Sequence, residues 1–279
     1  MANRSDGTGA GGPLAGMRAV SIAVNLPGPA AAQILAHEGM EVVKIEGPGG
    51  DLLADAAPGW YAELSAGIDV RRLDLRTGDG FAALRALLAG ADLLLSSQRR
   101  GGLARLGITS NALAAINPRL CWVEIVGDTD APDVPGHDLT YQFEAGLLAP
   151  PTMPRTLLAD LAGAREAAFA AVALLLGRAA GGAARHRAVG LRQAAQGFDA
   201  PLRFGVTVGD GFLSGSLPGY RMYRLRDGWA AVAALEPHFA ARFAAAVGDA
   251  PETFFASASA AEIEALARTH DLPIEARRD

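Results

Sequence analysis

The sequence predicts an α/β protein in which a Rossmann-like parallel sheet, with helices on both faces, is followed by a smaller α+β domain. From Met17 onward, short apolar runs alternate with stretches of helical composition. The first run ends in a Pro/Gly turn that opens a helix, which is typical of a βαβ unit. Of the 279 residues, 50% are hydrophobic, so the chain can bury a substantial core.

The apolar runs are the predicted strands of the sheet, and they cover residues 18–24, 41–45, 71–75, 92–96 and 120–126. The helical stretches between them cover residues 30–37, 80–88 and 109–116. This order predicts mainly parallel strands covered by helices on both faces. A further helix, over residues 163–178, is apolar nearly all round, so we expect it to be buried.

The character of the chain changes near Pro201. Beyond it, glycine, proline and short β-like runs at residues 220–225 and 229–235 predict a small α+β part. The expected parts are a flexible N-terminus over residues 1–12, a large Rossmann-like domain over 13–200 and a small domain over 201–279.

Composition excludes several classes of partner. The 25 basic and 30 acidic side chains leave a net charge of −5 without a lysine cluster, which argues against nucleic acid. The longest strongly apolar stretch, residues 167–176, is too short to span a membrane, and the first residues show no apolar signal segment. The single cysteine, Cys121, fits a reducing compartment. We therefore expect a cytoplasmic protein with neither a nucleic-acid nor a membrane partner.

Several common cofactor and hydrolase signatures are absent. The chain has no H-E-x-x-H, C-x-x-C or G-x-S-x-G motif, so we expect neither a metal site nor a serine-hydrolase elbow. It has no G-x-G-x-x-G fingerprint, and its one lysine, Lys44, does not follow a glycine as a Walker A loop requires. We expect no nicotinamide or flavin cofactor.

Two basic or turn-forming segments are candidate anion sites. The turn Pro27-Gly28-Pro29 opens a helix at the carboxyl end of a strand, where backbone N–H groups suit a pyrophosphate, although an ordinary tight turn is the simpler interpretation. A second segment follows the strand at 92–96 and is either a solvated basic turn or a phosphate clamp; its arginines are Arg99, Arg100 and Arg105.

Three further positions carry titratable groups in suggestive places. Gly136-His137-Asp138 opens a helical stretch, so His137 is either an exposed imidazole for chemistry or a hydrogen-bonded loop residue. Asp160 stands between apolar residues just before the apolar helix, where a carboxylate caps the helix, serves chemistry, or does both. Glu236 closes an apolar run that should be a buried strand, so we expect a cationic partner for it.

In this order the motifs resemble the class III CoA-transferase family, which also contains the 2-methylacyl-CoA racemases. The resemblance spans roughly residues 13 to 245 and rests on GPLAGMRAVSIAVNLPGPAAAQILAHEGMEVVKIEGPGGD, ADLLLSSQRRGGLARLGI, INPRLCWVEIVG, PGHDLTYQFEAGLL, LLADLAGAREAAFAAVALLLGR and LPGYRMYRLRDGWAAVAALEPHF. It implies that the large domain binds CoA, that an acyl-CoA and a carboxylic acid are the substrates, and that two chains form an interlinked homodimer.

The resemblance also assigns roles to single residues. In the transferases an aspartate attacks the acyl-CoA thioester and forms acyl-aspartyl and aspartyl-CoA intermediates, and it matches Asp160. In the racemases that aspartate works with a histidine that exchanges the α-proton through an enolate; this histidine matches His137, and its supporting glutamate matches Glu236. Backbone N–H groups near Asp160 or Gly136 are candidates to stabilise the oxyanion. Transfer is the commoner activity in the family and needs only Asp160, whereas the complete set of His137, Asp160 and Glu236 brings racemisation close to it. We therefore place CoA transfer narrowly first and racemisation second.

The chain also departs from the family pattern. A basic N-R-x-K-R-like stretch that contacts CoA in many members is replaced by residues 64–70, LSAGIDV, and an arginine of some racemases is replaced by Gly47. The small domain and the C-terminal segment are shortened relative to most members. These losses keep open a third hypothesis, a non-catalytic subunit that binds CoA.

Overall fold

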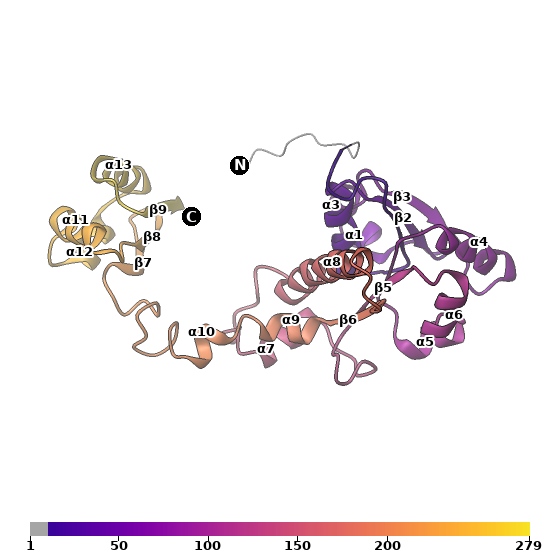
Figure 1. The fold of residues 1–279 in the computed structure, drawn as a ribbon. Helices are drawn as coiled ribbons and strands as arrows, with labels where there is room; N and C mark the ends of the chain where they lie inside the picture. The colour runs from indigo at the N-terminus through magenta and orange to yellow at the C-terminus, as the bar shows by residue number, and fades with distance from the viewer. Residues whose placement is uncertain (1–10) are drawn as a thin grey trace. The chain divides into compact units, whose positions relative to one another are not determined.

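A computed structural model describes residues 11–279 (Figure 1). The chain divides into two compact units, the first ending at Phe198 and the second spanning Asp199–Asp279. Of the segment expected to be flexible, residues 1–12, the first ten lie outside the described residues. In the part of the chain that is described, no helix has both the length and the apolarity needed to cross a bilayer.

The first unit is built on a parallel sheet, as the sequence predicted, with six strands. Its strands are β1 (Arg18–Ser21), β2 (Glu41–Glu46), β3 (Asp69–Arg72), β4 (Leu93–Ser96), β5 (Cys121–Val126) and β6 (His186–Gly190). They lie in the order β3-β2-β1-β4-β5-β6, and every neighbouring pair is parallel. The α/β prediction is confirmed.

Helices cover both faces of this sheet. They are α1 (Pro27–His37), α2 (Leu52–Ala56), α3 (Pro58–Leu64), α4 (Gly78–Ala89), α5 (Arg100–Arg105), α6 (Ser110–Ile116), α7 (Asp138–Glu144), α8 (Leu158–Ala179) and α9 (Leu191–Gln196). Alternate residues of each central strand point to opposite faces: Leu93 and Leu95 of β4 pack with α1 and α8, whereas Leu94 packs with α4, α5 and α6. Apolar runs without alternation are therefore strands buried on both faces.

The two edge strands of this sheet differ most from the sequence prediction. Strand β3 covers Asp69–Arg72 rather than residues 71–75, and its exposed charged residues mark it as an edge strand. Strand β6, HRAVG, forms the other edge and was not predicted, because only its last two residues are buried and no apolar run announces it.

Helix α8 is long and apolar, but it is buried on one side only. Its alanines pack against the sheet and against α1, while Phe169 and Leu176 are 68% and 69% exposed and Val172 is 40% exposed. The prediction that this helix is buried all round is therefore wrong for the described chain. Composition gave no way to separate a side that faces the sheet from a side that faces outward.

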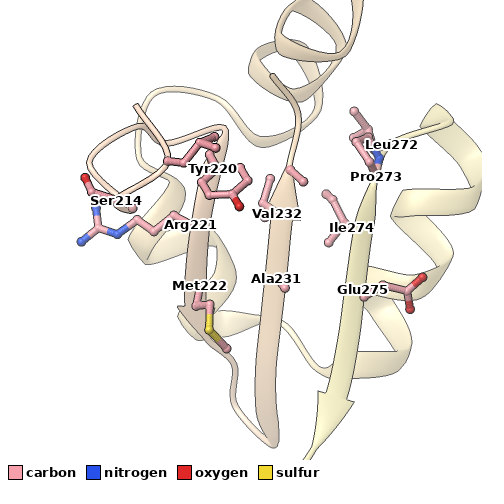
Figure 2. Close-up of a pocket in the computed structure, with 13 residues that line it drawn as sticks. Ser214, Tyr220, Arg221, Met222, Ala231, Val232, Leu272, Pro273, Ile274 and Glu275 are labelled. Carbon is pink, nitrogen blue, oxygen red and sulfur yellow. The ribbon is translucent and has the colours of Figure 1, made fainter. Parts of the chain in front are cut away.

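The second unit is a small α+β domain, as the sequence predicted. Its elements are α10 (Ala200–Arg203), β7 (Tyr220–Arg224), β8 (Gly228–Ala233), α11 (Pro237–Val247), α12 (Pro251–Ser257), α13 (Ala260–His270) and β9 (Ile274–Arg278). The antiparallel sheet β7-β8-β9 packs one face on the last three helices, where Ala230 and Val232 are buried. The other side carries a cavity of about 890 Å³ with Ala231 and Met222 in its wall (Figure 2).

A buried ionic cluster attaches the segment after β2 to the first unit. Lys44 is 1% exposed, and its Nζ donates to Glu46 at 2.8 Å and to Asp51 at 2.6 Å. Tyr61 of α3 donates to the same Glu46 at 2.6 Å, and Asp51 also caps α2 by accepting from the N–H of Leu53. Burial disfavours the charge, but the two carboxylates outweigh it, so the pKa of Lys44 is raised.

We predict that Lys44→Met lowers the free energy of unfolding by about 3–5 kcal/mol, because it leaves two carboxylates facing each other in a buried site. The matched control is Arg71→Met, which removes an equally short but half-exposed pair with Asp69 and should lower it by less than about 1 kcal/mol. Urea unfolding curves measure both. Equal losses in the two variants would show that burial does not set the strength of the Lys44 cluster.

Candidate active site

A cavity of about 270 Å³ opens at the carboxyl ends of the central strands. Its wall includes Val24 after β1, Ser97 after β4 and Val126 at the end of β5. From β1 the sheet continues through β2 to β3 on one side, and from β4 through β5 to β6 on the other. The cavity therefore lies at the topological switch point, where open α/β sheets bind their ligands.

Hydrogen bonds fix the two loops that meet at this point. The Oγ of Ser97 accepts from the N–H of Val24 at 2.9 Å and donates to its carbonyl at 3.1 Å. The side-chain amide of Gln98 donates to the carbonyl of Ile22. Hydrogen bonds between side chains of one loop and the backbone of the other connect the two loops. This part of the cavity wall is therefore held in place by the chain itself.

Asp160 lies in the first turn of α8 and in the cavity wall. Its backbone N–H donates to Asp138 Oδ1 at 3.1 Å, and Gln142 donates to Asp138 Oδ2 at 2.5 Å. The buried Asp138 carboxylate is thus the cap of α8, and Gln142 also donates to the carbonyl of Thr156 just before that helix. Capping was one of the roles that sequence analysis left open for Asp160, and the structure gives the cap to Asp138.

The electrostatics of the Asp160 carboxyl group follow from this position. Burial, and after it the negative charge of Asp138, raise the pKa of Asp160 to about 6. A carboxylate of this pKa is more basic than an ordinary aspartate and is still largely ionised at neutral pH. A carboxyl group in a cavity wall is a candidate functional group when burial and a neighbouring charge shift its pKa strongly.

His137 reaches the same cavity from α7, the helix it caps. Its backbone N–H donates to Thr140 Oγ1 at 3.1 Å, and that hydroxyl donates back to the His137 carbonyl at 2.8 Å. His137 is exposed. The structure therefore brings together His137 and Asp160, which the sequence separates by 23 positions.

Among the predicted binding residues, Pro27, Arg99 and Gly136 line the cavity. Gly28 and Pro29 are buried and are not part of its wall, and a Cβ on Gly28 would lie 2.4 Å from that of Ala23. Prolines have no N–H, so Gly28 is the one backbone donor among the first three residues of α1. The cluster of free N–H groups expected at this turn is therefore not present, and Gly28 serves close packing.

Arg100 does not line the cavity. It forms a forked contact with both carboxylate oxygens of the buried Glu124, at 3.0 and 3.1 Å, and His186 lies 3.3 Å from the same group. Burial opposes the charge of Glu124, but the hydrogen bonds from His186 and Arg100 outweigh it and lower its pKa. Arg100 thus compensates a buried charge. Arg105 is exposed in the last turn of α5 and is not part of the cavity wall.

Glu236 belongs to the second unit. Strand β8 ends at Ala233, and Glu236 is the exposed residue before α11, whose first residue is Pro237. No ion pair of Glu236 occurs among residues 11–279, so the expectation of a buried strand end with a cationic partner is wrong. The apolar run stops sooner than its composition suggested, because the chain leaves the sheet before the glutamate.

Two features of the site were not predicted. Tyr141, one helical turn after His137, is 6% exposed and lines the cavity. Arg192 ties the loop after β5 to α7, since it donates to Asp128 at 2.9 Å and pairs with Glu144. Helical spacing from His137 was the available signal for Tyr141, whereas no sequence pattern indicates the Arg192 contacts.

Chemically, the site offers a raised-pKa carboxyl group, an imidazole and a tyrosine hydroxyl around one cavity. Such a set suits nucleophilic attack by the carboxylate or proton exchange between two sides of a substrate. Within residues 11–279, no group of three or more His, Cys, Asp or Glu side chains is placed to hold a metal ion.

Known proteins resemble this chain in sequence. It is 32% identical over 154 residues to the succinate–glutarate CoA-transferase of Agrobacterium fabrum, covering 49% of this chain and 38% of that protein. It is 29% identical over 245 residues to the alpha-methylacyl-CoA racemase of Homo sapiens, covering 81% of this chain and 62% of that protein. The aligned part thus spans about 40 to 60% of the length of these curated relatives.

Solved structures share the fold. The Mycobacterium tuberculosis protein Rv3272 superimposes with a TM-score of 0.81 at 24% identity, over 94% of this chain and 84% of that one. A CAIB/BAIF family protein from Brucella suis gives 0.78 at 23% identity, over 95% and 83%. The sequence model of CoA-transferase family III matches residues 14–275. The resemblance predicted from the motifs is confirmed: this chain belongs to CoA-transferase family III.

Proposed function

We propose that the protein transfers CoA between an acyl-CoA and a carboxylic acid, with Asp160 as the nucleophile. The observation that carries this proposal is the position of Asp160: a carboxyl group of raised pKa, in the first turn of α8, in the wall of the switch-point cavity. Several relatives named as CoA-transferases support transfer as the reaction.

The proposed reaction proceeds through covalent aspartyl intermediates. A carboxylate oxygen of Asp160 attacks the thioester carbonyl, the C–S bond breaks, and CoA leaves as the thiolate, so an acyl-aspartyl anhydride remains. The thiolate then attacks the Asp160 carbonyl carbon and releases the acyl group as its carboxylate, which leaves an aspartyl-CoA thioester. A second carboxylate attacks this thioester, and the returning thiolate completes the new acyl-CoA and restores Asp160.

CoA binding is part of the same proposal. The first unit would hold the CoA, with Pro27 and Arg99 in the cavity wall and Arg105 as an exposed cation on the same segment. Gly136 and Asp138 would act indirectly, the glycine through its place in the wall and the aspartate through the cap of α8. As the family resemblance implies, Glu236 would support the catalytic histidine, and the protein would be cytoplasmic.

We predict that Asp160→Asn lowers the rate of CoA exchange between an acyl-CoA and a free carboxylic acid by at least a factor of about 10³, because the amide is a poor nucleophile. Mass spectrometry of the thioester products measures the exchange over a panel of acyl-CoA and acid pairs. In the wild type, hydroxylamine added with acyl-CoA should leave a hydroxamate on Asp160, and none on the variant.

The control for this variant is its stability. A raised native pKa means that the folded state holds the Asp160 proton more tightly than the unfolded chain, so ionisation costs stability as the pH rises from about 4 to about 6. Asp160→Asn avoids that cost and should be more stable than the wild type at pH 7 by on the order of 1–3 kcal/mol. A variant that keeps activity ends the transfer proposal. A wild type that binds CoA but converts no thioester would favour the non-catalytic alternative.

Racemisation of a 2-methylacyl-CoA is the second candidate function. The observation in its favour is that His137 and Asp160 line one cavity, as an acid/base pair on two sides of a substrate requires. One group would remove the α-proton to give an enolate, and the other would return a proton to the opposite face. A relative named as a racemase supports this alternative.

We predict that, if the protein racemises, a 2-methylacyl-CoA incubated in deuterated water takes up deuterium at its α-carbon, and that His137→Gln reduces this uptake by about 10²–10⁴-fold. The same variant should keep acyl transfer, which needs only Asp160. Mass spectrometry follows the label. Transfer without any α-exchange in the wild type would discard racemisation and leave transfer standing.

We further propose a homodimer, interlinked as the family resemblance implies. The outer side of α8 supports it, since Phe169, Val172 and Leu176 form an exposed apolar stripe at helical spacing.

Light scattering should therefore give twice the 28.7 kDa chain mass, and replacing Phe169 and Leu176 by glutamate should yield monomers after refolding. A wild-type mass of one chain would contradict the dimer, whatever the activity.

A further inference from the structure

Tyr141 is a buried cavity residue for which neither transfer nor racemisation has so far needed a role. It lies in α7, one helical turn after His137, with 6% of its surface exposed. Both residues line the cavity that also holds Asp160. A phenylalanine would fill this place as well, so the presence of a hydroxyl group needs an explanation.

The backbone on both sides leaves room for that hydroxyl. A Cβ built on Gly127, after β5, would lie 2.3 Å from Tyr141 Oη, and a Cβ built on Gly136 would lie at the same distance. Neither glycine has a positive φ, so backbone conformation does not require them. Two separate segments of the cavity wall are therefore free of side chains where the phenol oxygen lies.

The hydroxyl group has no partner within the described chain. Tyr141 Oη takes part in no hydrogen bond with residues 11–279, whereas the buried Tyr223 donates to the carbonyl of Pro218 at 2.9 Å and Tyr61 donates to Glu46. Tyr141 Oη is not among the side-chain oxygens of residues 11–279 that are both enclosed and unpartnered, so it is open to the cavity. What fills the cavity is thus the partner left for this donor.

The surroundings keep the phenol protonated. Burial, and after it the charges of Asp128, Asp160 and Glu144, raise the pKa of Tyr141. At neutral pH the group is a hydrogen-bond donor and not a base. It lines the same cavity as the Asp160 carboxylate that the proposed reaction uses, so a bound substrate can supply the acceptor.

We propose that Tyr141 Oη donates a hydrogen bond to the thioester carbonyl oxygen of the bound acyl-CoA, which makes Tyr141 a further catalytic residue. The inference rests on the proposed function. When Asp160 attacks the carbonyl carbon, the π electrons move to that oxygen and the donor stabilises the resulting oxyanion; no proton is transferred. In α-proton exchange the enolate oxygen receives the same stabilisation, so the role holds for either reaction.

The test is Tyr141→Phe, which keeps the ring and removes the hydroxyl. We expect kcat to fall by about 10²–10³-fold, as for loss of one oxyanion donor, with KM for the acyl-CoA changed only a few-fold. Thermal stability should be unchanged, since no hydrogen bond of the described chain is lost. The matched control is Tyr223→Phe in the second unit, which loses a hydrogen bond of the fold and should be less stable with unchanged kcat.

A second pair of variants tests the geometry without any activity. Gly127→Ala should lower the melting temperature because its Cβ meets Tyr141 Oη, and Tyr141→Phe should restore it, since the next ring atom lies 3.5 Å away. An active wild type with full kcat in Tyr141→Phe overturns the catalytic role. A wild type that converts no thioester overturns the proposed function itself. If Tyr141→Phe does not restore the melting temperature that Gly127→Ala lowers, the placement of the hydroxyl is overturned.

Discussion

The contact on which the site depends is the hydrogen bond from the N–H of Asp160 to the carboxylate of Asp138. It caps the longest helix of the first unit with a side chain from another helix, and so fixes where the first turn of α8 meets the cavity. The same contact sets a negative charge beside the Asp160 carboxyl group, which burial already disfavours as an anion. The contact between Asp138 and Asp160 thus both positions the first turn of α8 and adds to the rise in the pKa of Asp160.

The apolar runs of β1, β4 and β5 predicted the centre of the sheet, because strands buried on both faces need continuous apolar sequence. Edge strands lack that requirement, and β6, HRAVG, has Val189 as its one large apolar residue. The motifs led to Asp160 and His137 by resemblance, but the Asp138 cap joins positions 22 residues apart and depends on how α7 and α8 pack. Such tertiary contacts leave no periodic signal in a single sequence.

Charged residues of similar appearance in the sequence have different uses in the fold. Arg99 and Arg100 are adjacent, yet Arg99 lines the cavity and Arg100 compensates the buried Glu124. Removing Arg100 would leave that carboxylate with His186 as its remaining partner, which is why we assign it to the fold and not to phosphate binding. Counting arginines near a strand end cannot separate the two uses, since the partner of Arg100, Glu124, lies on another strand.

The cavity wall is rigid where chemistry needs fixed groups. Arg192 and Gln193 hold Asp128 at the start of the loop that leads to His137, and Thr140 closes the other end. Groups that are fixed before a substrate arrives need no reorganisation when charge develops, and this is the condition under which a hydrogen-bond donor lowers a barrier. The loop composition, rich in proline and aspartate, therefore serves the site by restricting its motion, although none of these anchoring side chains has to touch the substrate.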